Sequence, residues 1–176
     1  MNEKIILHKK DIEKIIEENS KRIIDNVKNI DDLAIVGIQT RGVELANRIK
    51  AKIETLSKKS IKSGILDITF YRDDIATRGV LPEIKETRID FDISNMTILL
   101  VDDVIFTGRT TKAAIETLMS FGRPRAIRLF VLIDRGSREL PIQPDYCGYK
   151  TETTVHDKVK VRLQETDNLD DVVILS

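Results

Sequence analysis

The sequence predicts an α/β fold in which helices flank a mostly parallel central sheet. Three short runs, residues 33–38, 96–103 and 126–134, are almost continuously apolar, which is typical of parallel strands buried on both faces. Stretches with apolar residues at helical spacing lie between these runs. The resulting strand–helix alternation favours a parallel sheet with right-handed crossover connections.

The individual elements follow in order along the chain. Residues 9–28 carry apolar side chains at roughly helical spacing and predict a helix with one buried face. A later helix should end at Gly122, because glycine is suited to a helix C-cap. The pattern loosens after Arg135. The predicted order is helix 9–28, strand 33–38, helix 42–56, strand 64–72, strand 96–103, helix 110–122, strand 126–134, and β-like pieces at 158–163 and 171–175.

Length, charge and cysteine content limit the class of protein. A chain of 176 residues predicts a single domain, spanning residues 1–176, with a sizeable core. Its 29 basic and 29 acidic residues give no net charge, so binding to nucleic acid would need a local basic patch. Cys147 is the single cysteine, and the sequence shows neither a membrane-spanning run nor a signal peptide; together these predict a cytoplasmic protein.

Residues 71–95 do not fit this compact pattern. They contain many charges, a glycine and a proline, and they show no clear period. Loops of this length inside a compact domain are usually lids or disordered segments. Because the segment starts on the ligand side of the predicted sheet, we expect a mobile lid.

Polar residues follow three of the predicted strands, at positions 37–42, 102–110 and 134–135. In open parallel sheets, ligands bind beyond the carboxyl ends of the strands. We therefore expect these three segments to face the same crevice.

Asp102 and Asp103 end one strand, and residues 107–110 follow with hydroxyls, a glycine and a helix start. Two adjacent carboxylates need hydrogen-bond donors or cations as partners. The free N–H groups of a helix start, together with threonine hydroxyls, favour an anion, most often phosphate. A ribose 5-phosphate has hydroxyls and a phosphate in this arrangement.

Other interpretations of this motif are less favoured. A Walker phosphate loop is rejected, because the first glycine and the spacing of GxxxxGK[ST] are missing. A receiver domain has paired acids at the end of its first strand, whereas this pair lies past residue 100 and precedes a hydroxyl-rich loop. The remaining alternative is an acidic strand end beside a capped helix, without a ligand.

The segment ILLVDDVIFTGRT (98–110) resembles the signature of type I phosphoribosyltransferases: apolar residues, two acids and a Thr-Gly-x-Thr loop. Further segments resemble one family of that class, the PyrR family, in order over nearly the whole chain. They are VGIQTRGVELA (36–46), ITFYRDD (68–74), FGRPRAIRLFVLIDRGSRELPIQPDY (121–146) and KVKVRL (158–163). The resemblance implies a type I phosphoribosyltransferase fold with a small hood and a mobile lid. It also implies uracil phosphoribosyltransferase activity combined with RNA-binding control of pyrimidine operons.

The resemblance implies a role for each residue at a matching position. Asp102 and Asp103 would hold the ribose hydroxyls of phosphoribosyl pyrophosphate and would be catalytic together with Arg72. Arg135 and the backbone at Val159 would read the edge of uracil. The implied contacts to phosphoribosyl pyrophosphate are Thr40, Arg41, Asp102, Asp103, Val104, Ile105, Phe106, Thr107, Gly108, Arg109 and Thr110.

The implied reaction depends on charge and positioning. Thr40 and Arg41 would bind the pyrophosphate, and residues 107–110 would bind the 5-phosphate. Mg²⁺ is implied as a cofactor held by substrate oxygens and water, without direct protein ligands. As pyrophosphate leaves, positive charge builds on the sugar and N1 of uracil attacks, while the closed lid excludes water.

The second role of the family, RNA binding, requires a basic face, and the predicted first helix is mixed in charge. The arginines between residues 123 and 138 are a candidate patch in a dimer, with Arg123, Arg125 and Arg138 as the expected RNA contacts. The expected partners are phosphoribosyl pyrophosphate, uracil, UMP, the leader RNA of pyrimidine operons, and further copies in a homodimer or higher homo-oligomer. Two alternatives stay open: a purine phosphoribosyltransferase of the same fold, and a purely regulatory RNA-binding protein with residual activity.

Overall fold

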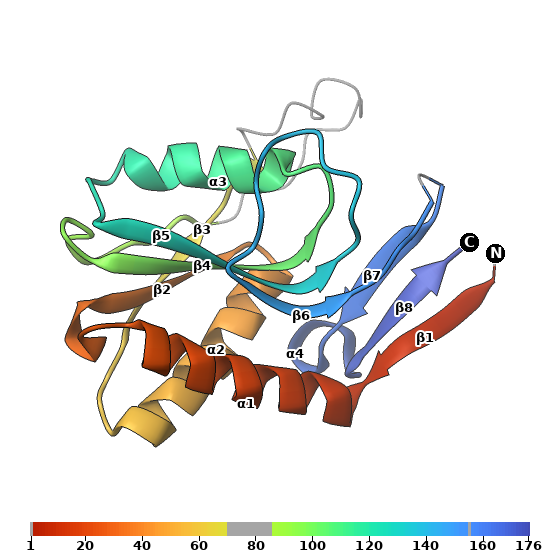
Figure 1. Ribbon diagram of the computed structural model, residues 1–176, viewed down its shortest axis with the longest axis horizontal. Helices are drawn as coiled ribbons and strands as arrows, with labels where there is room; N and C mark the ends of the chain where they lie inside the picture. Colours follow the sequence, from red (N-terminus) through yellow and green to blue (C-terminus); the bar gives the residue numbers. More distant parts are fainter. Residues whose placement is uncertain (1, 70–85, 155) are drawn as a thin grey trace.

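The computed structural model describes residues 2–69, 86–154 and 156–176 and contains two sheets (Figure 1). The larger sheet has five parallel strands in the order β3-β2-β4-β5-β6, which confirms the predicted α/β fold with a mostly parallel sheet. The smaller sheet is antiparallel, in the order β1-β8-β7. The elements are β1 (Glu3–His8), α1 (Lys9–Asn26), the short 3-10 helix η1 (Ile30–Asp32), β2 (Leu33–Ile38), α2 (Arg41–Ser57), β3 (Lys62–Leu66), β4 (Thr97–Ile105), α3 (Arg109–Met119), β5 (Ala126–Asp134), β6 (Tyr146–Lys150), β7 (Lys158–Arg162), α4 (Gln164–Asp167) and β8 (Asp171–Leu175).

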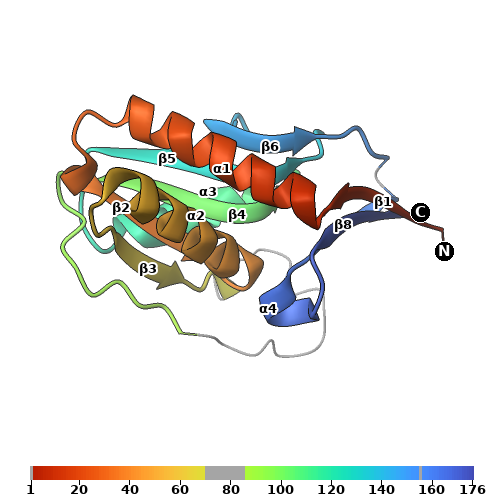
Figure 2. The ribbon, with the colours of Figure 1, turned by 90° about the horizontal axis from the view of Figure 1, so that it is seen from below.

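Helices cover both faces of the parallel sheet, α1 and α2 on one face and α3 on the other (Figures 1 and 2). Successive side chains of a strand point to opposite faces, so Ile35 packs with the side chains of α1 and α2 and Val36 with those of α3. Both residues are fully buried. This double burial explains why the central strands are continuously apolar in sequence.

The strand order determines where a ligand crevice forms. From β2 the chain passes through α2 to β3, and from β4 it passes through α3 to β5 in the opposite direction along the sheet. The order therefore reverses between β2 and β4, which are neighbouring parallel strands. In open parallel sheets ligands bind at such a point, beyond the carboxyl ends of the two strands, and we call this place the crevice.

Two glycines allow the start of α2 to approach the ends of β2 and β4. A Cβ atom on Gly42 would lie 2.5 Å from the carbonyl oxygen of Val101 and 3.2 Å from Cα of Asp102. A Cβ on Gly37 would lie 2.5 Å from Cα of Val43. No side chain fits at either position, and the first turn of α2 therefore packs directly against β4 at the crevice.

We call the small sheet, together with the short helix α4, the hood (residues 3–8 and 158–175); it lies at one end of the parallel sheet (Figure 2). β8 is its central strand and pairs with both β1 and β7. The β-like pieces predicted at 158–163 and 171–175 are confirmed as β7 and β8. Strands β1 and β6 were not predicted from the sequence pattern.

Two predicted elements end several residues earlier in the structure than the sequence pattern indicates. The strand predicted over residues 64–72 ends at Leu66, where Asp67 accepts a hydrogen bond from the backbone N–H of Thr69 at 2.9 Å and the chain turns. The helix predicted over residues 110–122 ends at Met119. Its C-cap is Ser120, whose hydroxyl donates to the Thr117 carbonyl at 2.6 Å, and not Gly122.

The predicted lid, residues 71–95, lies largely outside the described residues, which resume at residue 86. The part from residue 86 onward packs on the domain. Arg88 exchanges two backbone hydrogen bonds of 2.8 Å with Ile65, and Ile93 is fully buried among the side chains beneath α3. Residues 86–95 are therefore anchored to the domain at Arg88 and Ile93, and the lid itself stays a prediction. Within the described ranges, no helix is long and apolar enough to cross a membrane.

Candidate functional site

The end of β4 places Asp102 and Asp103 at the crevice. The N–H of Asp103 donates to Asp102 Oδ1, and the N–H of Val104 donates to Asp103 Oδ1, both at 2.9 Å. Burial raises the pKa of Asp103, although hydrogen bonds and the positive charge of Arg41 act in the opposite direction. A desolvated carboxylate of this kind is stabilised by additional donors, and the hydroxyls of a sugar can supply them.

Residues 107–110 form the turn from β4 into α3. Gly108, the N-cap residue of α3, has a φ of 92°, in the left-handed region that favours glycine. The N–H of Arg109 donates to Thr107 Oγ1 at 3.3 Å, and the Arg109 guanidinium pairs with Glu139 at 2.7 Å. The first N–H groups of a helix have no partner within the helix, so this turn presents backbone donors and hydroxyls to an anion.

Arg138 supports this turn from the side. Its guanidinium donates to the carbonyls of Phe106 at 3.0 Å and Ile142 at 2.9 Å, and it pairs with Asp134 at 2.8 Å. Only 12% of the Arg138 side chain is exposed. This arginine therefore ties the loop after β5 to Phe106, the residue that precedes the turn.

Arg123 and Arg125 lie at the opposite end of the sheet from Arg138. They precede β5, which is nine residues long, and a strand of that length spans about 30 Å. Arg123 is exposed, and Arg125 pairs with Asp32 at 3.0 Å. Within one chain Arg138 therefore lies apart from Arg123 and Arg125 and is largely buried, and a patch formed by these arginines in a dimer stays a prediction.

A second helix N-terminus reaches the crevice at Thr40 and Arg41. Thr40 is the N-cap residue of α2, its carbonyl accepts the N–H of Val43 at 3.2 Å, and the peptide bond before it is cis. The Arg41 guanidinium makes two hydrogen bonds to Asp167 of α4, Nε to Oδ2 at 3.2 Å and Nη2 to Oδ1 at 2.7 Å. Because Arg41 begins α2, which packs against the end of β4, its charge lies near Asp103.

Arg135, at the end of β5, is turned toward the hood. Its Nε donates to Thr153 Oγ1 at 2.9 Å, and its Nη2 donates to the carbonyls of Thr154 and Asp157, each at 2.9 Å. Its guanidinium also lies 4.1 Å from the centre of the Phe106 ring, and burial lowers its pKa. The side chain thus ties the loop before β7 to the end of β5 and to the turn that follows β4.

Val159, in β7, is half-buried and packs against the apolar cluster that Val104 also contacts. The hood and the end of β4 therefore share a core at this point. Arg72 lies outside the described residues. Within residues 2–69, 86–154 and 156–176, no group of three His, Cys, Asp or Glu side chains could hold a metal ion.

Sequence reasoning missed Asp167, which binds Arg41 across 126 residues of chain. The one available signal was the cluster of acids in residues 165–171, which outnumber the single nearby arginine, Arg162. It also missed the internal role of Arg138, whose partners are mostly backbone carbonyls.

Comparisons with known proteins agree with this geometry. The family model described as "Phosphoribosyl transferase domain" matches residues 2–166. A protein named bifunctional protein PyrR from Caldicellulosiruptor bescii is 52% identical over 155 residues, which cover 88% of this chain and 85% of that protein. Another of the same name from Chloroflexus aurantiacus is 46% identical over 174 residues, or 99% of this chain and 96% of that protein.

The fold has close neighbours among solved structures. A hypoxanthine phosphoribosyltransferase from Staphylococcus aureus superposes with a TM-score of 0.73 over 98% of this chain and 92% of its own, at 22% identity. Similarity at that identity shows the type I phosphoribosyltransferase fold. The residues after β2 and β4, the strand order and the two PyrR relatives lead to one conclusion: the chain belongs to the phosphoribosyltransferase domain family and, within it, to the PyrR family.

Proposed function

We propose that this phosphoribosyltransferase makes UMP and pyrophosphate from uracil and phosphoribosyl pyrophosphate. The observation that carries the proposal is the pairing of two helix N-termini, at Arg41 and Arg109, with the adjacent acids Asp102 and Asp103 at the strand reversal. Two anion sites on either side of two carboxylates correspond to a sugar with a phosphate group at each end.

Each part of the crevice has a task in this reaction. Asp102 and Asp103 accept hydrogen bonds from the ribose hydroxyls, and their negative charge stabilises the positive charge that develops on the sugar ring. The turn at residues 107–110 binds the 5-phosphate through backbone N–H groups and hydroxyls. Thr40 and Arg41 hold the departing pyrophosphate, for which the planar guanidinium is suited. Positioning supplies most of the acceleration, and no side chain needs to act as a nucleophile.

The donor set at the crevice is compatible with Mg²⁺, because carboxylate oxygens are the hard ligands that this ion prefers. Mg²⁺ would be held by substrate oxygens and water, with Asp102 and Asp103 as the nearest carboxylates and not as direct ligands. When bound, Mg²⁺ would neutralise charge on the pyrophosphate.

The residues on the hood side of the crevice would recognise the base. Arg135 holds Thr153, Thr154 and Asp157 in place, and Val159 follows them in β7. A base that reaches C1 of the ribose would meet the backbone of this segment, and backbone N–H and C=O groups can read the edge of uracil. Arg135 then acts on uracil mainly by positioning this loop.

The test is incubation of the pure protein with phosphoribosyl pyrophosphate and Mg²⁺, with each nucleobase in turn, followed by chromatographic measurement of the nucleotide. We expect UMP with uracil and little product with hypoxanthine or guanine. Faster formation of IMP or GMP would instead support the alternative of a purine phosphoribosyltransferase.

We propose as a second function that the chain regulates pyrimidine genes by binding their leader RNA when UMP is bound. The support is a group of three exposed arginines near the start of β5, Arg123, Arg125 and Arg128, of which Arg125 pairs with Asp32 and Arg128 with Asp145. A homodimer or higher oligomer, formed in the cytoplasm where this RNA is made, would double such a surface. Binding of leader RNA and of a scrambled RNA should be compared at two salt concentrations, with and without UMP. Superimposed curves would reject the regulatory function while leaving the enzyme intact.

A further inference from the structure

We propose that Asp167, in the hood helix α4, is a positioning residue that orients the Arg41 guanidinium for the pyrophosphate group of the substrate. The inference rests on the proposed function of the crevice and assigns to the hood a task at the pyrophosphate end of the site. The hood would thus act on both ends of the reacting bond, the base and the leaving group.

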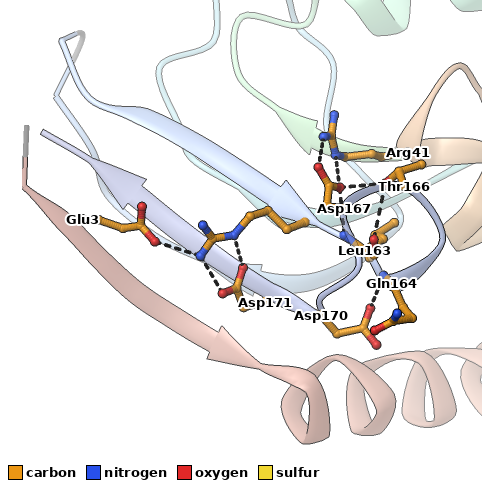
Figure 3. A network of polar contacts seen from close by, with 9 residues as sticks. Glu3, Arg41, Leu163, Gln164, Thr166, Asp167, Asp170 and Asp171 are labelled. Carbon is orange, nitrogen blue, oxygen red and sulfur yellow. Dashed lines mark hydrogen bonds and ion pairs between the residues drawn. The ribbon is translucent and has the colours of Figure 1, made fainter.

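The geometry of the pair carries the inference. Asp167 engages one edge of the guanidinium, with contacts of 3.2 Å to Nε and 2.7 Å to Nη2 (Figure 3). A guanidinium has five N–H donors in a rigid plane, so fixing one edge also fixes the direction of the Nη1 edge. A ligand oxyanion would bind to that second edge. The arrangement is a carboxylate that orients a cation, and the pair is mostly shielded from solvent, with 30% of the Arg41 side chain and 16% of the Asp167 side chain exposed.

Asp167 is itself held in place and charged. Its Oδ2 accepts hydrogen bonds from the N–H of Leu163 at 3.1 Å and from the hydroxyl of Thr166 at 2.6 Å (Figure 3). Burial opposes ionisation of this carboxyl, but the hydrogen bonds from Arg41, Thr166 and Leu163 hold its pKa well below the usual range. A fixed, ionised carboxylate is what the orientation of a flexible arginine requires, because the long side chain otherwise samples many rotamers.

The same turn of the hood contains a matched control. Arg48 follows Arg41 by two helical turns on α2 and pairs with Glu165 at 2.5 Å and with Asp170 at 2.7 Å. Asp170 also accepts the N–H of Gln164 at 2.9 Å. Both arginines therefore link α2 to the hood, but only Arg41 begins the helix at the crevice. Loss of the Asp170 pair should loosen the hood without changing the direction of Arg41.

The experiment compares Asp167→Asn with Asp170→Asn. Binding of inorganic pyrophosphate with Mg²⁺ is measured by calorimetry, and the KM values for phosphoribosyl pyrophosphate and uracil are measured separately. We expect Asp167→Asn to weaken pyrophosphate binding and to raise the KM for phosphoribosyl pyrophosphate about tenfold, as misplacement of a binding group does. The KM for uracil should stay unchanged in Asp167→Asn, and Asp170→Asn should bind pyrophosphate as tightly as the wild type does. Equal weakening in both variants would mean that the hood acts only by docking, and the positioning role would be overturned.

A double-mutant cycle separates positioning from general damage. If Asp167 acts through Arg41, Asp167→Asn should have no further effect on pyrophosphate affinity in an Arg41→Ala background. An undiminished effect in that background, or pyrophosphate binding by Asp167→Asn as tight as in the wild type, would overturn the inference. Failure of the wild type to make UMP would instead refute the proposed function, and the pyrophosphate titrations would still test the role of Asp167.

Discussion

Replacement of Gly42 by alanine tests the idea that close packing of α2 on β4 assembles the crevice. The new Cβ would lie 2.5 Å from the Val101 carbonyl oxygen, about 0.9 Å closer than an ordinary van der Waals contact. The contact is to backbone, so a side-chain rotation cannot relieve it. The start of α2 must move away from β4 by nearly 1 Å, and Arg41 moves with it.

The size of the effect follows from two opposing contributions. Alanine is the better helix residue by up to about 1 kcal/mol, whereas overpacking costs about 1–3 kcal/mol. We therefore expect a small net loss of stability, with Tm lower by a few degrees. Activity should suffer more, because displacement of a binding group by about 1 Å can lower the rate by up to 100-fold.

The assay is the rate of UMP formation as a function of phosphoribosyl pyrophosphate concentration, with Tm from circular dichroism. Asn47→Ala is the control, since it adds no atom and changes an exposed position of the same helix. A Gly42→Ala protein with wild-type Tm and wild-type KM for phosphoribosyl pyrophosphate would refute the argument that this contact positions Arg41.

Three further variants test other parts of the site. Asp103→Asn should lower UMP formation by at least about tenfold, and an unchanged rate would remove the central role of this acid. Burial raises the pKa of Asp103, so the ionised carboxylate destabilises the folded protein at neutral pH, and Asp103→Asn should raise Tm at pH 7. This gain in Tm should vanish below about pH 4, where the carboxyl group is protonated in both the folded and the unfolded protein. Arg135→Lys removes the planar fork that binds Thr153, Thr154 and Asp157, so the KM for uracil should rise while pyrophosphate affinity stays the same; a change in pyrophosphate affinity alone would contradict this assignment. Arg123→Glu should weaken binding of leader RNA, measured by filter retention, without slowing UMP synthesis, and unaltered RNA binding would exclude this surface.

The sequence predicted those parts of the site that are encoded locally. Asp102, Asp103 and the turn at residues 107–110 are adjacent in the chain, and their order after a buried strand is sufficient to predict an anion site. Strand β1 escaped prediction because its few residues lead directly into α1, and Ile5 is exposed although it is apolar. Its apolar run is only three residues long, 5–7, and these residues do not alternate with polar ones.

Interactions between distant segments could not be predicted from pattern. The pairing of Arg41 with Asp167 depends on where the hood docks, which no local signal encodes. Arg138 was expected at a surface for RNA because most arginines are exposed, yet it binds two backbone carbonyls and Asp134. Ile93 was placed in a lid because its neighbours are polar, whereas it is fully buried.

The hood sheet has a consequence for the order in which the protein folds. Its central strand, β8, joins β7 to β1, so residues such as Ile5 and Val173 must meet from opposite ends of the sequence. The strands of the parallel sheet, by contrast, all lie within residues 33–150, so none of them has to pair with the opposite end of the chain. Bringing the two ends of the chain together loses more conformational entropy than closing a shorter loop. We therefore expect the hood to form last during folding and to open first. In that partly folded state the residues that follow β4 would already be in place, whereas Arg41 would still lack its partner Asp167.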